Sequence, residues 1–158
     1  MKVDNEIRKI MEELQKPFQE QEIEWRVGST NADKTKGLAL AYITNRAIQN
    51  RLDQVFGCMG WKNEFKEWKG NSQLCGISVF YNGEWITKWD GSDNSEVEQV
   101  KGGLSDSMKR CAYQWGIGRY LYELESTWVK IKAVGKSYYL AETPKLPSWA
   151  LPNNPDSK

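Results

Sequence analysis

The sequence predicts an α+β fold in which an antiparallel β-sheet, made of a hairpin and a three-stranded meander, packs with helices. Three observations predict it: helical spacing of apolar residues in three segments, apolar–polar alternation between them, and an Asn-Gly pair at residues 82–83 that is typical of a hairpin turn. The 158 residues include 39% hydrophobic residues, with 8 Trp and 7 Tyr, which is enough for a sizeable core. We expect one domain over residues 1–143 and a Pro-rich, disordered tail over residues 144–158.

The helices are expected at residues 4–16, 44–56 and about 96–115. In the first, Ile7, Ile10 and Leu14 recur at spacings of three and four residues, and Pro17 ends the segment. The strands are expected at residues 22–27, 38–43, 61–69, 73–81, 84–90, 128–134 and 137–141. Their order, with helices before, between and after them, predicts a single antiparallel sheet rather than a parallel one. Polar connections are expected at residues 28–37 and 90–95.

The composition excludes several classes of function. The chain has no histidine, so the usual general base and the usual metal ligand are both missing. Cys58, Cys75 and Cys111 stand far apart, without the spacing of a metal site or of a redox pair. We therefore expect no catalytic residue, no metal and no cofactor. No apolar run approaches the roughly 20 residues of a membrane helix and the first residues lack a signal-peptide core, so we expect a cytoplasmic protein without a membrane partner.

The helix at residues 96–115 is the most informative element. Its apolar stripe consists of Val97, Val100, Leu104, Met108, Cys111 and Trp115. Its opposite face consists of Asp106, Lys109, Arg110 and Tyr113. One interpretation is a solvated face with an ion pair between Asp106 and Arg110. The other is a strip of two cations and an aromatic ring that holds phosphates beside a base, and residues 101–158 are basic overall, with 9 Lys and Arg against 5 Asp and Glu.

Aromatic residues also alternate along the expected meander. Trp85 and Trp89 share one strand face, and Trp61 and Phe65 share another. Such residues pack in cores more often than they stack on bases, so we expect core packing for all four. Tyr42 shares a strand face with Leu38 and Leu40, which favours a core residue whose hydroxyl is hydrogen-bonded.

An acidic cluster raises the alternative of a metal-dependent nuclease. Asp90, Asp93, Glu96 and Glu98 precede Lys101, and nucleases of that class use carboxylates near a lysine. The spacing matches no calcium loop, and carboxylates before a helix also stabilise its N-terminus through the helix dipole. The nuclease therefore stays the lesser alternative. A structural or protein-interaction module that does not bind DNA is a third class of function.

Two motifs carry a resemblance to a known family. Residues 100–116 read Val-Lys-Gly-Gly-Leu-Ser-Asp-Ser-Met-Lys-Arg-Cys-Ala-Tyr-Gln-Trp-Gly. Upstream, Tyr42-Ile43 precedes a helix that ends in Val55-Phe56-Gly57 and is followed by Gly60-Trp61. Together these segments resemble the Rad-fifty-two family of single-strand annealing proteins, over roughly residues 20–125, and the small size is similar to the compact members found in bacteriophages.

The resemblance implies an ATP-independent protein that binds and anneals single-stranded DNA in recombination and repair, in a bacterial host cell. It also implies a homo-oligomeric ring with the DNA in a positive groove, and phage or host recombination proteins as possible partners. The implied DNA-binding residues are Arg26, Tyr42, Lys101, Lys109, Arg110 and Tyr113. Tyr113 stands where better-known members carry a further basic residue, so a stacking contact would replace a phosphate contact there. Arg26 lies on the polar face of the strand at residues 22–27, with Glu22 and Glu24.

Overall fold

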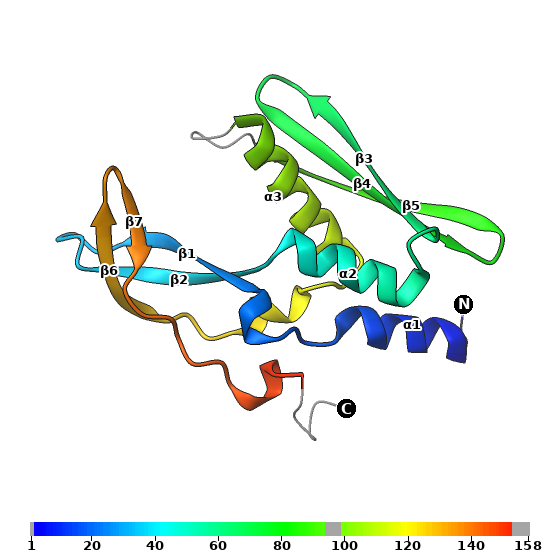
Figure 1. Cartoon of the computed structure of the whole chain (residues 1–158), viewed down its shortest axis with the longest axis horizontal. Coiled ribbons are helices and arrows are strands. Elements are labelled where there is room, and N and C mark those ends of the chain that lie inside the picture. Colours follow the sequence, from blue (N-terminus) through cyan, green and yellow to red (C-terminus); the bar gives the residue numbers. More distant parts are fainter. Residues whose placement is uncertain (1, 94–98, 153–158) are drawn as a thin grey trace. The chain divides into compact units, whose positions relative to one another are not determined.

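The computed structural model describes residues 2–93 and 99–152, and Figure 1 shows its elements. They form two compact units, each built from two stretches of chain. The first unit comprises Met1–Lys16 and Thr44–Arg119, and the second comprises Pro17–Ile43 and Tyr120–Lys158. Both units contain an antiparallel sheet and the first also contains α-helices, so the α+β class is confirmed. One annealing domain over residues 1–143 stays a prediction.

The first unit holds α1 (Asn5–Gln15), α2 (Asn45–Phe56), α3 (Gln99–Gln114), β3 (Trp61–Trp68), β4 (Ser72–Tyr81) and β5 (Glu84–Asp93). Side chains cap the first two helices. Asp4 Oδ1 accepts a hydrogen bond from the Ile7 N–H at 2.8 Å, and Thr44 Oγ1 accepts one from the Ala47 N–H at 3.2 Å. The predicted helices at residues 4–16 and 44–56 are therefore confirmed, each to within a residue at either end.

The strands β3, β4 and β5 form an antiparallel meander. Asn82 and Gly83 connect β4 to β5 with φ of 51° and 79°, which is the left-handed backbone that a two-residue hairpin turn requires. The polar connection expected at residues 90–95 is wrong for residues 90–93, which belong to β5. They stay in the sheet because pairing with β4 continues to Asp93, whose Oδ1 accepts a hydrogen bond from Ser72 Oγ at 2.7 Å.

The helix α3 lies along one face of this sheet (Figure 1). Cys111 is buried there, and its Sγ donates to the Lys88 carbonyl at 3.1 Å. Just beyond the helix, Trp115 Nε1 donates to the Ile77 carbonyl at 3.0 Å. The predicted stripe thus meets the sheet through Met108 and Cys111, both buried. Residues 94–98, which include the expected helix start near Glu96 and the stripe residue Val97, lie outside the described residues.

The second unit is built on a four-stranded sheet in the order β1-β2-β6-β7. Its strands are β1 (Ile23–Thr30), β2 (Lys36–Ile43), β6 (Trp128–Val134) and β7 (Ser137–Leu140). Short 3-10 turns accompany them: η1 (Glu20–Glu22), η2 (Arg119–Glu123) and η3 (Ser148–Ala150). The buried apolar side chains of this unit are Phe18, Ile23, Ile43, Leu121, Val129, Leu146 and Ala150.

The structure corrects the expectation of a single sheet. The hairpin of β1 and β2 pairs with β6, and the meander forms a sheet of its own. The alternation of residues along a strand marks the strand but does not identify its partner, and β6 comes about 85 residues after β2 in the chain.

The structure also describes residues 144–152 of the expected tail, where Leu146 and Ala150 are buried and η3 forms. These apolar side chains hold that stretch against the unit despite its prolines.

Candidate nucleic-acid interface

The second unit brings Arg26 and Tyr42 together. Glu24 of β1 lies opposite Tyr42 of β2, and Arg26 lies opposite Leu40, so all four side chains share one sheet face. The Arg26 guanidinium carbon lies 4.6 Å from the centroid of the Tyr42 ring. Arg26 Nε also lies 3.5 Å from Glu24 Oε1, in a pair whose side chains are 36% and 45% exposed. A guanidinium supported by an aromatic ring and open to water suits contact with a phosphate or a base.

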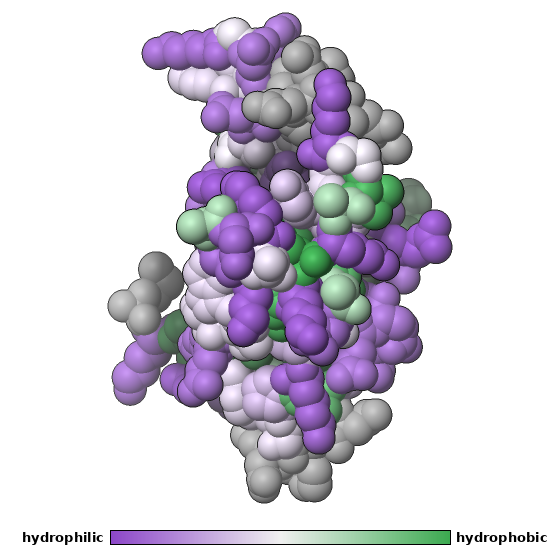
Figure 2. Space-filling model, turned by 90° about the vertical axis from the view of Figure 1, so that its left-hand side faces the viewer, coloured by the Kyte–Doolittle hydropathy of each residue, from purple (hydrophilic) through white to green (hydrophobic). Residues whose placement is uncertain are grey.

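Further cations lie on this same sheet face, at positions that the strand register fixes. Lys36 of β2 lies opposite Lys130 of β6, and Leu38 lies opposite Trp128. Lys132 follows on β6 at the next position of the same face, opposite Tyr139 of β7. We call this surface the basic sheet face, defined by Arg26, Lys36, Tyr42, Trp128, Lys130, Lys132 and Tyr139. Figure 2 views the molecule from the left-hand side of Figure 1, where β6 and β7 are drawn, and many hydrophilic side chains are visible from that side.

The basic sheet face is positively charged and rich in accessible rings. Across the strands of this sheet, all of which the structure describes, Glu24 is the single acidic residue at these register positions, against four cations. Trp128 is 47% exposed and Tyr139 is 52% exposed. Cations that hold a phosphate backbone, next to rings on which bases stack, are the usual elements of a surface for single-stranded nucleic acid.

The sequence motifs did not single out the other members of this face, which are Lys36, Lys130, Lys132, Trp128 and Tyr139. The alternation of Trp128, Lys130 and Lys132 along their strand is visible in the sequence and places them on one face. What the sequence did not reveal is that this strand pairs with β2, which aligns them with the strand that carries Tyr42.

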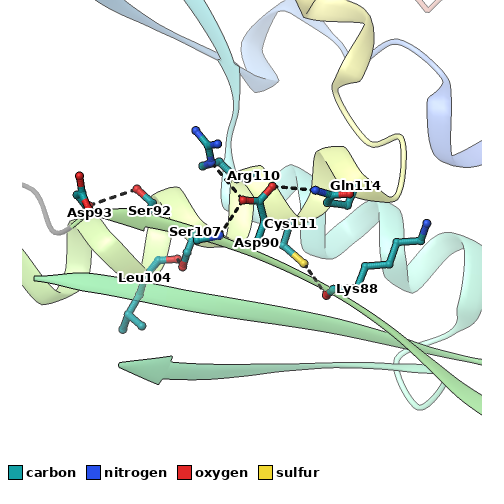
Figure 3. Close-up of polar contacts among 10 residues, drawn as sticks. Lys88, Asp90, Ser92, Asp93, Leu104, Ser107, Arg110, Cys111 and Gln114 are labelled. Atoms are coloured by element: carbon teal, nitrogen blue, oxygen red, sulfur yellow. Dashed lines mark hydrogen bonds and ion pairs between the residues drawn. The ribbon is translucent and has the colours of Figure 1, made fainter. Parts of the chain in front are cut away.

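The first unit holds Lys109, Arg110 and Tyr113 on α3, but their surroundings differ. Arg110 is exposed at 59% of its side chain, and its Nε lies 3.4 Å from Asp90 Oδ1 on β5 (Figure 3). One interpretation of this helix face paired Arg110 with Asp106, whereas the structure pairs Arg110 with Asp90 of the sheet. Because the guanidinium of this pair is open to water and its ion-pair distance is long, the pair is weak and a phosphate can compete with Asp90 for Arg110.

Lys109 is buried, with 4% exposure, although the helical periodicity predicts a side chain on the face opposite the core. Its Nζ donates to Ser105 Oγ at 3.0 Å, and Asn45 Nδ2 donates to the same hydroxyl at 3.2 Å. Asn45 begins α2, so a second helix packs against this flank of α3. The periodicity of one helix predicts which side meets the sheet, but it does not reveal a second neighbour.

Tyr113 and Lys101 complete the predicted set. The Tyr113 side chain is half-buried, and its carbonyl accepts hydrogen bonds from Arg119 Nε and Nη2 at 3.0 and 2.7 Å, which caps the end of α3. Lys101 belongs to the first turn of α3, and its side chain lies outside what the structure describes.

Convergence of Arg26 with Lys109 and Arg110 in one groove stays a prediction, because Arg26 belongs to the second unit and the other two residues belong to the first.

Asp90 organises the contacts between β5 and α3 that Figure 3 shows. Its Oδ2 accepts from Gln114 Nε2 at 3.0 Å, and its Oδ1 accepts from the Gly91 N–H at 2.7 Å. Partial burial raises the pKa of Asp90, but these hydrogen bonds and the Arg110 charge outweigh it, so the pKa lies below its ordinary value of 3.8. Asp90 is thus an ionised, hydrogen-bonded structural group.

The expected acidic cluster does not form a metal site in the described part of the chain. Asp90 is engaged by Gln114, Gly91 and Arg110, and Asp93 accepts from Ser72. Glu96 and Glu98 lie outside the described residues. Within residues 2–93 and 99–152, no group of three or more His, Cys, Asp and Glu side chains is placed to hold a metal ion. Over the same residues, no helix is long and apolar enough to cross a membrane.

Comparison with known proteins assigns the family. The profile of the Rad52/22 family of double-strand break repair proteins matches residues 6–75 and 77–138. The chain belongs to this family. The match confirms the resemblance to the Rad-fifty-two family inferred from the two sequence motifs, and it includes every strand of the basic sheet face except the last residues of β7.

Two curated relatives extend the comparison. The chain is 33% identical over 148 residues to the single-stranded DNA-binding protein DdrA of Deinococcus radiodurans, a match that covers 92% of this chain and 69% of the relative. It is 32% identical over 154 residues to the DdrA protein of Deinococcus deserti, covering 92% of this chain and 71% of the relative. Like the family profile, these matches extend over most of the chain, so both compact units take part in them.

Proposed function

We propose that this protein binds single-stranded DNA without sequence specificity and anneals complementary strands in recombination and repair. The basic sheet face is the observation that carries the proposal, because it combines four cations and exposed rings on one side of a rigid sheet. Membership of the Rad52/22 family and similarity to two proteins named for single-stranded DNA binding support it.

The chemistry of the basic sheet face suits annealing. Lysine and arginine contacts to phosphates carry no sequence information, and they leave the base edges free to meet a complementary strand. Each neutralised phosphate also releases counterions, so binding weakens as salt increases. Annealing breaks and forms no covalent bond, and therefore the proposed activity requires no catalytic residue, ATP or metal ion.

Assembly into a homo-oligomeric ring is part of the proposal. Among the described strands, β3 and β5 each have one edge without a hydrogen-bonded partner strand, whereas β1 and β7, the end strands of the other sheet, contact each other. Pairing or covering of such edges by neighbouring copies protects them from uncontrolled association. A ring also repeats a weak phosphate site many times, which raises total affinity for one long strand. We place this activity in the cytoplasm of a bacterial host, with phage or host recombination proteins as possible partners.

Three measurements on the full chain test the proposal. Fluorescence anisotropy with labelled oligo-dT, a mixed-sequence single strand and a duplex should show tighter binding to both single strands than to the duplex. Labelled complementary strands should anneal faster with the protein than without it, in the absence of ATP and of divalent metal. Light scattering should give a mass several times that of one chain. Absence of single-strand binding at low salt would refute the proposed function, and magnesium-dependent cleavage of the strands would favour the nuclease.

A further inference from the structure

The three-stranded sheet of the first unit has a second face, turned away from α3. Strand register places Lys62 and Lys66 of β3 on this face together with Trp85 and Trp89 of β5. Trp85 is 44% exposed and Trp89 is 37% exposed, so the core packing expected for these two residues from the sequence is wrong. The helix α3 covers only the opposite face, which carries Lys88 and Asp90, and these tryptophans therefore remain accessible to solvent.

Lysines and tryptophans are paired on this second face. Lys62 Nζ lies 4.7 Å from the centroid of the Trp85 ring, and Lys66 Nζ lies 4.8 Å from that of Trp89. At the end of β3, Lys69 Nζ lies 5.5 Å from the centroid of Trp68, which is 52% exposed. We call this surface the Lys–Trp face, defined by Lys62, Lys66, Trp68, Lys69, Phe80, Trp85 and Trp89.

The sheet itself holds these rings in place. A Cβ added at Gly76 would come within 2.8 Å of the Trp89 indole, so the ring lies directly over this glycine. Phe80 and Trp85 contact each other, with ring centroids 5.2 Å apart. Ser78 and Thr87 form a hydroxyl–hydroxyl hydrogen bond of 2.7 Å on the same face. The rings are thus positioned by the sheet before any ligand arrives, and polar groups lie among them.

We propose that the Lys–Trp face binds single-stranded nucleic acid as a second surface, separate from the basic sheet face. Bases would stack on Trp85 and Trp89, and the lysines over these rings would turn to the phosphates. Stacking of a base on an indole is worth more than an exposed lysine over the same ring, so this exchange is favourable. The inference rests on the proposed single-strand binding and adds a second contact surface to it.

The charge of the Lys–Trp face favours a nucleic acid over a second copy of the chain. Three lysines lie on it, against Glu64 and Asp93, and Asp93 is hydrogen-bonded to Ser72. In the described part of the chain, each of these lysines contacts an indole and none forms an ion pair. Protein interfaces are depleted in lysine, because burying an ammonium group without a carboxylate is costly. A polyanion supplies a phosphate for each lysine.

Titration of labelled oligo-dT by anisotropy tests the inference on the full chain. Trp85→Ala and Trp89→Ala should each weaken binding about tenfold, the loss expected for one stacked base. Trp85→Tyr keeps a ring and should restore most of the affinity. Lys62→Glu combined with Lys66→Glu leaves the tryptophans in place and should weaken binding at least as much. Trp149→Ala is the matched control, since Trp149 is 40% exposed and lies in η3, outside both faces.

Light scattering on the same variants distinguishes a nucleic acid from a second copy of the chain as the ligand of the Lys–Trp face. The oligomer mass should be unchanged in each variant while DNA affinity falls. Wild-type affinity in both tryptophan variants and in the double lysine variant would overturn the inference. A lower mass in the tryptophan variants would also overturn it, since the face would then be an interface between copies. If wild-type protein binds no single-stranded DNA, the proposed function itself fails, which is a different result from unaltered variants of a binding protein.

Discussion

The guanidinium of Arg26 lies over the ring of Tyr42, with 4.6 Å between the guanidinium carbon and the ring centroid. Two neighbouring strands supply the pair, since Arg26 belongs to β1 and Tyr42 to β2. The ring orients the planar cation without neutralising it, and the side chain stays 36% exposed. This arrangement prepares Arg26 for a planar, two-point contact with a phosphate.

Substitutions of Arg26 should distinguish the contribution of its positive charge to DNA affinity from that of its planar guanidinium. Arg26→Ala should weaken single-strand binding about tenfold for every sequence tested, as expected for loss of a hydrogen bond to a charged group. Arg26→Lys keeps the charge but loses the planar fork, so it should recover the affinity only in part. Anisotropy titrations with oligo-dT and a mixed-sequence strand measure both effects. Equal affinity of Arg26→Ala and wild type would remove Arg26 from the site.

The rings of the basic sheet face should contribute to affinity but not to its salt dependence. Tyr139→Ala should weaken binding about tenfold, because about one stacked base is lost. The slope of log affinity against log salt should stay unchanged, since no phosphate contact is removed. Tyr139→Phe is the control and should bind like wild type. A changed slope in Tyr139→Ala would show that the ring acts through the cations around it.

Alanine substitutions at the adjacent residues Lys109 and Arg110 should differ in their effect on the stability of the protein. Lys109→Ala removes a buried side chain and its hydrogen bond to Ser105, so it should lower the free energy of unfolding by about 1–3 kcal/mol. Arg110→Ala removes an exposed side chain with one long ion pair and should cost at most about 1 kcal/mol. Urea denaturation measures both. If Lys109→Ala is as stable as wild type, Lys109 does not contribute to the packing of α2 on α3.

Asp90 should stabilise the fold in a pH-dependent way. Its pKa is lowered in the folded protein, so its contribution is present above the ordinary value of 3.8 and is lost as the pH falls through the lower folded value. Asp90→Asn should therefore be less stable than wild type at neutral pH, and the difference should shrink as the pH falls below 3.8. Thermal melts of both proteins across this range measure the effect. A difference that is the same at every pH would mean that the charge of Asp90 is unimportant.

Local patterns in the sequence predicted the elements well. Asp4 and Thr44 do cap their helices, and Asn82-Gly83 does make the hairpin turn. These features depend on a few neighbouring residues, so they can be inferred from the chain alone. The prediction that Arg26 lies on the polar face of its strand was also correct, since the buried Ile23 lies on the other face of β1.

Features that depend on distant residues could not be predicted in this way. The pairing of β2 with β6 joins Lys36 to Lys130 across more than 90 residues, so the basic sheet face was not anticipated. Lys109 lies on the flank of α3 that α2 covers, and only the tertiary structure reveals this second neighbour. Trp85 and Trp89 look like core residues by composition, but α3 covers the other face of their sheet.

The salt dependence of single-strand binding tests the central claim most directly. We would measure the affinity for labelled oligo-dT over a range of salt concentrations with wild type and with the triple variant Arg26→Ala, Lys130→Ala, Lys132→Ala. Lys9→Ala changes an exposed lysine of α1, which is not a member of the basic sheet face, and this control should match wild type. If the basic sheet face holds the phosphate backbone, the slope of log affinity against log salt should become shallower by roughly 2, about 0.7 for each lost contact. A triple variant with wild-type affinity and slope would contradict the account.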